Sequence, residues 1–389
     1  MESKEISKPV GIKDVARYAG VSISTVSNVL NGKRAVRARL RERVQEAINQ
    51  LEYVANPIGR QLKTGRSQQV ALVVPSLTDA LFPSVLKGLQ SAADAAGYMV
   101  SVFATGGSIS RERRIIDWLR SQRFECVFLD SCADADVPET ADYLAFLRAV
   151  DSAQERPMRV ICAATAISPH LDTVVVDDAA GVAQVTEHLL RGGRRHPAYI
   201  ALSTPCCHAK ARRSGFLSAL AHGGLSADEA LIEADGVTCR SGYEAMARLL
   251  DAGRTVDAVV CGSDQLAIGA LHCLEERGVQ VPEEVAVAGF GDTAPASLMT
   301  PSLTTVRVPW EELGRRAFAL FHLHDKPAPC GEEGPDDGAE PCRKAPSCDE
   351  EAPGEEAPSR EPTLIRLDPQ LIIRHSTDSD APSTWAPDW

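Results

Sequence analysis

Short apolar runs alternate with helical patterns between residues 70 and 277, and this alternation constrains the fold more than any other feature. The runs are rich in Val, Ile, Phe and Tyr and have the length of buried strands: VALVV at 70–74, YMVSVF at 98–103, CVFLD at 126–130, RVICA at 159–163, TVVV at 173–176, AYIAL at 198–202 and DAVVC at 257–261. Helical spacing separates most of them, for example at 83–96, 111–121, 179–191, 209–222 and 264–277. The alternation predicts parallel sheets with helices on both faces, a fold that binds ligands beyond the carboxyl ends of its strands.

The length of 389 residues suggests two such lobes in addition to a smaller domain. No apolar run approaches the length of a membrane helix, and the N-terminus lacks the apolar region of a secretory signal. The eleven cysteines show no evenly spaced framework, which suits free thiols in a reducing compartment. We therefore expect a cytoplasmic protein that does not interact with membranes.

Residues 12–31, IKDVARYAGVSISTVSNVLN, predict two short helices joined by a tight turn. Apolar residues recur at helical spacing up to Ala19, and Gly20-Val21-Ser22 then interrupts the run. Ser22 can cap a second helix over 23–30, and a third helix is expected over 40–52. This layout is a helix-turn-helix, whose second helix can enter the major groove of DNA, although an ordinary helical hairpin has the same pattern.

The charge distribution favours the DNA-binding interpretation. Residues 1–66 contain 13 Lys/Arg and 6 Asp/Glu, a net charge of +7, so the remaining 323 residues carry −19 of the total of −12. A basic head on an acidic body is typical of a nucleic-acid module fused to a sensor. The link before the third helix and the exposed face of that helix offer four arginines to phosphates: Arg37, Arg39, Arg41 and Arg43.

Catalytic motifs are missing from the sequence. It contains no GxSxG, no HExxH and no glycine-rich phosphate loop, so we expect neither an enzyme nor a cofactor. Cys206-Cys207-His208 is the only local cluster of potential metal ligands, and adjacent cysteines do not easily share a tetrahedral site. We interpret this cluster as part of a structural loop, and we expect no metal site.

The chain resembles the lactose-repressor (LacI/GalR) family of bacterial transcription regulators. In the N-terminal part the matching residues are IKDVARYAGVSISTVSNVLNG from residue 12, RERVQEAINQLEYV from residue 41 and NPIGRQLKTGRS from residue 56. Further matches occur in the family's order downstream: GFLSAL at 215–220, SDQLAIGAL at 263–271, RGVQVPEEVAVAGFGD at 277–292 and TPSLTTVRVPWEELGRRA at 300–317. The resemblance implies a helix-turn-helix head and a bilobed core like that of periplasmic binding proteins, crossed three times by the chain.

The resemblance also implies the contacts of the head with DNA. Ile23, Ser24 and Asn28 match the base-contacting positions, where an amide can bond to a base edge and an isoleucine can touch a thymine methyl group. Residues 56–63 match a hinge helix that forms in the minor groove, and Leu62 matches the leucine that wedges between base pairs there. Gly59 replaces a common alanine and should weaken this helix by about 1 kcal/mol. The other candidate DNA contacts are Thr25, Ser27, Asn31, Arg37 and Arg60.

In the core, the resemblance implies a small effector bound in the cleft between the lobes. Arg212 matches the arginine that clamps effector hydroxyls or carboxylates, and the other expected contacts are Ser76, Phe82, Ser263, Asp264 and Asp292. Several positions depart from the family: Ser263 replaces an asparagine, Gly291 an aspartate, Ala164 a polar residue and Val237 an aromatic one. Losing these groups leaves sugar hydroxyls without partners. A plain monosaccharide is therefore disfavoured, and a phosphorylated ligand held by Arg212, a different ligand or partial loss of sensing all remain open.

We accordingly expect an α/β protein with an N-terminal all-α helix-turn-helix head and a bilobed core of two doubly wound parallel sheets. The expected parts are the DNA-binding domain 11–57, the hinge and linker 58–68, the first lobe 69–165 with 293–325, and the second lobe 166–292 with 362–376. Between them, residues 327–361 contain 11 Asp/Glu against 3 Lys/Arg and almost no large apolar residue, which predicts a disordered acidic insertion in the second lobe connection.

The expected function is repression by a dimer that binds a palindromic operator and responds to an effector. Two alternatives stay open: control of the DNA-binding protein by a protein partner, and a cytoplasmic solute-binding protein with a vestigial head.

Overall fold

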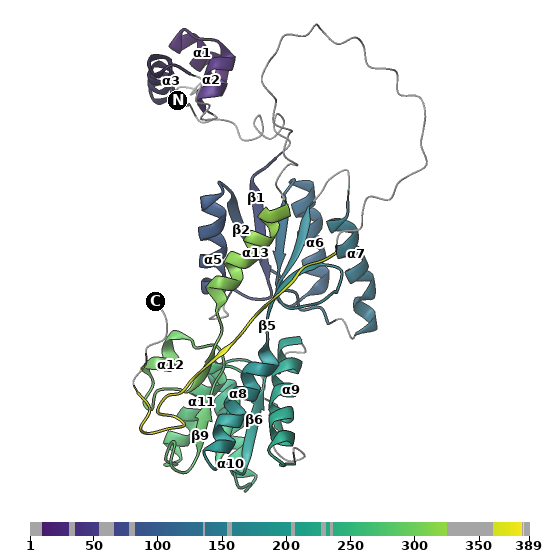
Figure 1. Cartoon of the computed structure of the whole chain (residues 1–389), viewed down its shortest axis with the longest axis vertical. Helices are drawn as coiled ribbons and strands as arrows, with labels where there is room; N and C mark the ends of the chain where they lie inside the picture. The colour runs from purple at the N-terminus through teal and green to yellow at the C-terminus, as the bar shows by residue number, and fades with distance from the viewer. Residues whose placement is uncertain are drawn as a thin grey trace, which may run out of the picture. The chain divides into compact units, whose positions relative to one another are not determined.

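The computed structural model describes residues 10–30, 36–53, 66–77, 82–134, 137–153, 158–203, 207–226, 231–233, 236–324, 361–382 and 384. The chain divides into two compact units, Met1–Ser67 and Gln68–Trp389, which we call the head and the core (Figure 1). The predictions for Asn31, for Arg60 and Leu62 in the hinge, and for almost all of the acidic insertion concern residues outside the described part.

The head is a three-helix unit, and its helix-turn-helix is confirmed. Helix α1 spans Ile12–Ala19, α2 spans Ile23–Leu30 and α3 spans Ala38–Gln50. The turn between α1 and α2 contains Gly20 at φ 59°, a left-handed conformation that glycine adopts without strain. The three helices bury a small common core of Val15, Ala16, Ala19, Val26, Val44 and Ala47.

The first lobe of the core is built on a six-stranded parallel sheet with the order β11-β5-β4-β3-β1-β2. Its strands are β1 Gln69–Val74, β2 Met99–Ala104, β3 Cys126–Leu129, β4 Arg159–Ala164, β5 Asp172–Val176 and β11 Leu364–Leu367. The helices of this lobe are α5 Phe82–Ala95, α6 Ile109–Ser121, α7 Ala141–Asp151 and α13 Trp310–His324, with a 3-10 turn at Pro138–Thr140. Strands β1, β3, β4 and β5 are almost fully buried, as their continuous apolar runs predict.

The second lobe has a four-stranded parallel sheet with the order β7-β6-β8-β9. Its strands are β6 Pro197–Ala201, β7 Leu231–Glu233, β8 Ala258–Cys261 and β9 Ala286–Ala288. Its helices are α8 Asp178–Arg191, α9 Cys207–His222, α10 Cys239–Asp251, α11 Asp264–Glu276 and α12 Ala294–Leu298. An antiparallel pair, β10 Thr305–Arg307 with β12 Gln370–Ile372, packs against α8. The two doubly wound parallel sheets are thus present.

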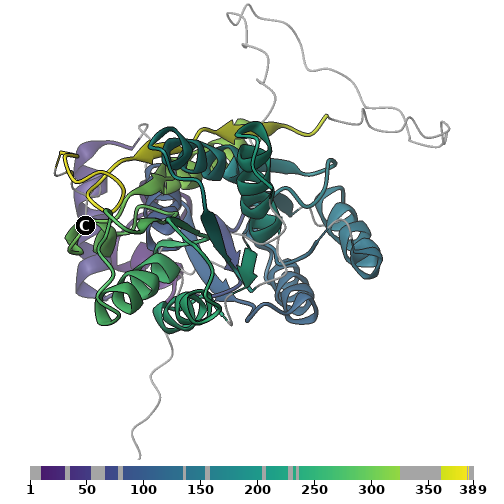
Figure 2. The ribbon, with the colours of Figure 1, turned by 90° about the horizontal axis from the view of Figure 1, so that it is seen from below.

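The lobe boundaries differ from the prediction. Strands β5 and β11, expected in the second lobe, are hydrogen-bonded to each other in the sheet of the first lobe. The chain therefore crosses between β5 and α8, between β10 and α13, and between β11 and β12; the last segment, yellow in Figures 1 and 2, runs along one side of both lobes. The prediction failed because an apolar strand has the same pattern in either sheet. The acidic insertion consequently lies between α13 and β11, two elements of the first lobe.

Candidate DNA-binding surface and inter-lobe site

Helix α2 presents a small polar surface to solvent. Its first turn is capped by Ser22, whose hydroxyl oxygen accepts a hydrogen bond from the Thr25 backbone N–H at 3.1 Å. Val26 is fully buried against α1 and α3, which turns Ile23 and Ser24 outward; Ile23 is 45% exposed. The remaining predicted contacts of α2, Thr25, Ser27 and Asn28, are half-buried. A helix that buries one apolar side and shows short polar side chains on the other can lie in a major groove.

The four arginines at and before α3 differ in their contacts within the head. Arg37 immediately precedes the helix and is exposed, as are Arg39 and Arg41. Arg43 instead reaches back to α1, where its Nη2 donates a hydrogen bond to the Ala19 carbonyl oxygen at 2.6 Å. This bond satisfies a carbonyl at the C-terminal end of α1, so Arg43 also links α3 to α1.

In the core, Arg212 lies on α9 and is buried in the second lobe. Its Nη1 donates to the Gly262 carbonyl oxygen at 2.8 Å, and its Nε donates to Asp178 Oδ1 at 3.3 Å. The guanidinium also lies over the ring of Phe290, with 3.9 Å between Cζ and the ring centroid. Arg212 is thus preorganised by the chain's own groups, beside the carboxyl ends of β8 and β9.

Asp178 at the start of α8 links Arg212 to His208. The His208 Nδ1 contacts Asp178 Oδ2, and its Nε2 lies 3.9 Å from Oδ1 of Asp130, which follows β3 in the first lobe. Burial alone would raise the pKa of Asp178, but the charges of Arg212 and His208 more than offset it and lower the pKa. Burial likewise opposes protonation of His208, yet Asp178 and Asp130 raise its pKa well above the usual value. The two aspartates therefore favour the protonated form of His208, which lies between the two lobes.

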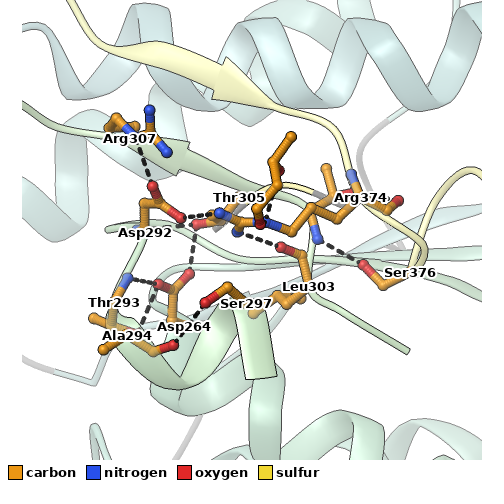
Figure 3. Close-up of polar contacts among 12 residues, drawn as sticks. Asp264, Asp292, Thr293, Ala294, Ser297, Leu303, Thr305, Arg307, Arg374 and Ser376 are labelled. Carbon is orange, nitrogen blue, oxygen red and sulfur yellow. Dashed lines mark hydrogen bonds and ion pairs between the residues drawn. The ribbon is translucent and has the colours of Figure 1, made fainter. Parts of the chain in front are cut away.

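Asp264, expected to contact an effector, is buried and fully engaged inside the second lobe. Its Oδ1 accepts from the Thr305 hydroxyl at 2.5 Å, and its Oδ2 accepts from the Thr293 N–H at 2.6 Å and the Thr293 hydroxyl at 2.9 Å (Figure 3). Burial nevertheless raises the pKa of this carboxyl. The side chain ties the start of α11 to the loop before α12 and to β10.

Asp292 is the second predicted effector contact that the structure places in a buried network. Its Oδ2 accepts from Arg307 Nε at 2.6 Å and its Oδ1 accepts from Nη2 of the fully buried Arg374 at 2.7 Å (Figure 3). Arg374 also donates to the Leu303 carbonyl oxygen. Both predicted effector contacts, Asp264 and Asp292, thus have hydrogen-bond partners within the protein, and these partners lie in segments that only the fold brings near.

The other predicted effector contacts lie at the carboxyl ends of strands. Ser263 caps α11, its hydroxyl accepting from the Leu266 N–H at 3.4 Å. Ser76 is exposed just after β1, and Phe82 is half-buried at the start of α5. Sequence reasoning did not include Asp130 and Asp178, and it assigned His208 to a structural loop. One signal was the position of both aspartates at or within two residues of the carboxyl ends of predicted strands.

The described residues hold no group of three or more His, Cys, Asp or Glu side chains placed to bind a metal. In the same part of the chain, no helix is long and apolar enough to cross a membrane.

Comparison with known proteins agrees with this architecture. Residues 11–56 match the model of bacterial regulatory proteins of the lacI family, and residues 186–332 match the periplasmic binding protein-like domain. The transcriptional regulator RegA of Clostridium saccharobutylicum is 29% identical over 312 residues, which cover 80% of this chain and 91% of RegA. The transcriptional repressor CytR of Escherichia coli K12 is also 29% identical, over 82% of this chain and 91% of CytR.

Solved structures show the same fold over nearly the whole chain. The lac repressor dimer bound to operator and the anti-inducer ONPF superposes with a TM-score of 0.77 at 23% identity, covering 95% of this chain and 99% of the repressor chain. The complex of the regulator CelR with cellobiose gives a TM-score of 0.61 at 27% identity, covering 94% and 99%.

A helix-turn-helix head joined to a two-lobe core of this kind defines a DNA-binding transcriptional regulator. The chain belongs to the LacI family of bacterial transcriptional regulators. Its relatives are regulators of transcription rather than enzymes.

Proposed function

We propose that this regulator is a repressor that binds a palindromic operator as a dimer, with α2 of each head in a major groove. The observation that carries the proposal is the orientation of α2, which buries Val26 and turns Ile23 and Ser24 outward. The net charge of +7 on residues 1–66 supports binding to phosphates. The descriptions of two similar proteins support the proposal. CytR is a transcriptional repressor, and the lac repressor was solved as a dimer bound to operator. The protein would then act in the cytoplasm, on the nucleoid.

We also propose that a small molecule bound between the lobes controls the repressor. Arg212 lies beside the carboxyl ends of β8 and β9, and Ser76 and Phe82 would approach a ligand from the first lobe. The similar CelR was solved with cellobiose, a sugar. Here the side chains of Arg212, Asp264 and Asp292 all have protein partners, so a ligand would have to share or replace those hydrogen bonds. Calorimetry with sugars and sugar phosphates tests this; if none binds and a protein partner alters operator affinity, control by that partner is favoured instead.

The contribution of α2 to base recognition leads to the first prediction. The double variant Ser24→Ala, Asn28→Ala is expected to bind the operator about tenfold to hundredfold more weakly, because a good contact to a base edge contributes about 1–3 kcal/mol. The operator is first selected from a random DNA pool with the full chain, and binding is then measured by fluorescence anisotropy on that sequence and on a scrambled one.

Arg240→Ala, on the exposed surface of α10, serves as the control and should leave both affinities unchanged. Specific recognition by α2 requires the loss to occur on the selected operator and to be small on the scrambled sequence. An equal loss on both sequences would assign Ser24 and Asn28 to the phosphate backbone, and no loss on either would remove α2 from the proposed interface.

A further inference from the structure

Two ion pairs connect the lobes directly. Asp130 and Asp134 follow β3 in the first lobe, whereas His208 and Lys210 lie in the first turn of α9 in the second lobe. His208 Nε2 lies 3.9 Å from Asp130 Oδ1, and the Lys210 ammonium group contacts Asp134 Oδ2. We call these four residues the junction cluster. It lies at the carboxyl end of β3, on the side of the first lobe that faces the second.

The second lobe holds the cationic side of the junction cluster in place. His208 can point at Asp130 because its other ring nitrogen is bonded to Asp178, and Asp178 in turn is bonded to Arg212. Arg212 is anchored on the Gly262 carbonyl oxygen, so the whole chain of contacts rests on the rigid ends of α8, α9 and β8. Side chains fixed in this way lose little further entropy when a partner approaches.

The anionic side is supported in the same way by the first lobe. Asp134 is largely buried, and the backbone N–H of Asp130 donates to the Val73 carbonyl oxygen at 2.9 Å. Behind Asp130, the Ser131 hydroxyl donates to Glu112, a buried carboxyl of α6 whose pKa is raised by burial to about 7. His208 and Asp130 are therefore each supported by contacts within their own lobe, whereas the Lys210 side chain is 52% exposed.

We propose that the junction cluster is a built-in latch: His208 and Lys210 hold the two lobes together without a bound molecule, so that a ligand controls the protein by displacing them. Oppositely charged groups about 4 Å apart attract strongly where solvent is partly excluded. A ligand that enters between the lobes displaces His208 and Lys210 from Asp130 and Asp134. It stabilises the new arrangement only if its own contacts compensate for the two lost ion pairs. The arrangement with both ion pairs formed is then the state of the protein without a ligand. The arrangement without these ion pairs is the state that a bound ligand stabilises.

The latch has a defined dependence on pH. Each ion pair requires a charged group on both lobes. His208 faces Asp130 after β3 and Asp178 on α8, and Asp178 also pairs with Arg212 on α9. Because the pKa of folded His208 lies above its value of 6.5 in the open chain, the contribution of its charge is fully present below pH 6.5. That contribution is lost as the pH rises through the raised pKa. Glu112, whose pKa is raised by burial to about 7, lies behind Ser131 and interacts electrostatically with Asp130.

Hydrogen exchange on the full-length, dialysed protein tests the latch. In the double variant Asp130→Asn, Asp134→Asn, the backbone amides of 130–134 and 207–212 are expected to exchange about tenfold faster than in the wild type at neutral pH, since charge-assisted bonds are lost on both sides. The amides of the buried strands β1 and β8 should be unchanged, which shows that the variant is folded. His208→Gln added to this double variant should produce no further acceleration in 130–134.

Asp251→Asn is the matched control, because Asp251 pairs with Arg277 at 2.9 Å within the second lobe and does not cross between lobes. It should leave exchange in 130–134 at the wild-type rate. The proposal is overturned if the double variant also exchanges at the wild-type rate in both segments, or if Asp251→Asn accelerates them equally. The role of a ligand in displacing the latch rests on the proposed function, whereas hydrogen exchange needs neither ligand nor DNA, so the two can fail separately.

Discussion

Replacing Arg374 with methionine is expected to lower the free energy of unfolding of the core by about 3–5 kcal/mol. Methionine fills much of the same volume, so the loss comes from the charge and its hydrogen bonds. Arg374 is fully buried and donates to Asp292 and to the carbonyl oxygens of Leu303 and Thr384. Without it, the Asp292 carboxylate stays buried with Arg307 as its remaining cation, and two carbonyl groups lose their donors. Urea denaturation followed by circular dichroism measures the change.

Arg316→Met provides the comparison, because Arg316 pairs with Glu312 at 2.6 Å on the exposed face of α13. That substitution should change the free energy of unfolding by less than about 1 kcal/mol. Adding Asp292→Asn to Arg374→Met should recover part of the loss, since the unpaired buried charge is then removed. If Arg374→Met lowered the free energy of unfolding no more than Arg316→Met does, the Arg374–Asp292 pair would not be what joins the C-terminal segment to the second lobe.

The local elements of this protein could be predicted because each depends on a few adjacent residues. Ser22 caps α2 as its position after Gly20-Val21 indicates, and the Val- and Ile-rich runs form the buried strands. Sheet membership could not be predicted in the same way. TVVV at 173–176 and TLIRL near 365 satisfy the apolar pattern of either lobe, and only the parallel pairing of β5 with β11 assigns both to the first.

The hydrogen bonds of the predicted effector contacts could not be predicted from the sequence. Arg212 lies beside the ends of β8 and β9 as expected, whereas Asp264 and Asp292 turn into the lobe because Thr305 and Arg374 supply their hydrogen bonds. Those partners lie 41 and 82 residues away, and no local pattern relates them. His208 is a comparable case, since its role depends on Asp178, 30 residues away in the chain, and on an aspartate from the other lobe. Buried polar groups follow the tertiary fold, and the linear pattern carries little information on them.

Gly269→Ala is expected to destabilise the core by about 2–3 kcal/mol, although the same change in an open helix position stabilises by up to about 1 kcal/mol. Gly269 lies in α11 where that helix meets α10. A Cβ atom there would approach the Cys239 carbonyl oxygen much closer than 3.0 Å, a distance that real Cβ atoms do not reach. The obstacle is backbone, so α10 and α11 must move apart. Thermal unfolding of the full chain measures this change in stability. A loss of stability, where an open helix position would give a gain, identifies the close contact.

The matched control for this prediction is Gly192→Ala at the end of α8. Gly192 has φ −71°, and the Leu189 carbonyl oxygen would lie 3.3 Å from the new Cβ, so a shift of a few tenths of an ångström accommodates the methyl group and the effect should be much smaller than at Gly269. A stabilised Gly269→Ala variant would contradict the close contact of α10 with α11. Because α11 begins at Asp264 and follows Gly262, whose carbonyl accepts from Arg212, separation of the two helices should also disturb the lobe junction. Faster hydrogen exchange at 207–212 in the Gly269→Ala variant is therefore the second expected result.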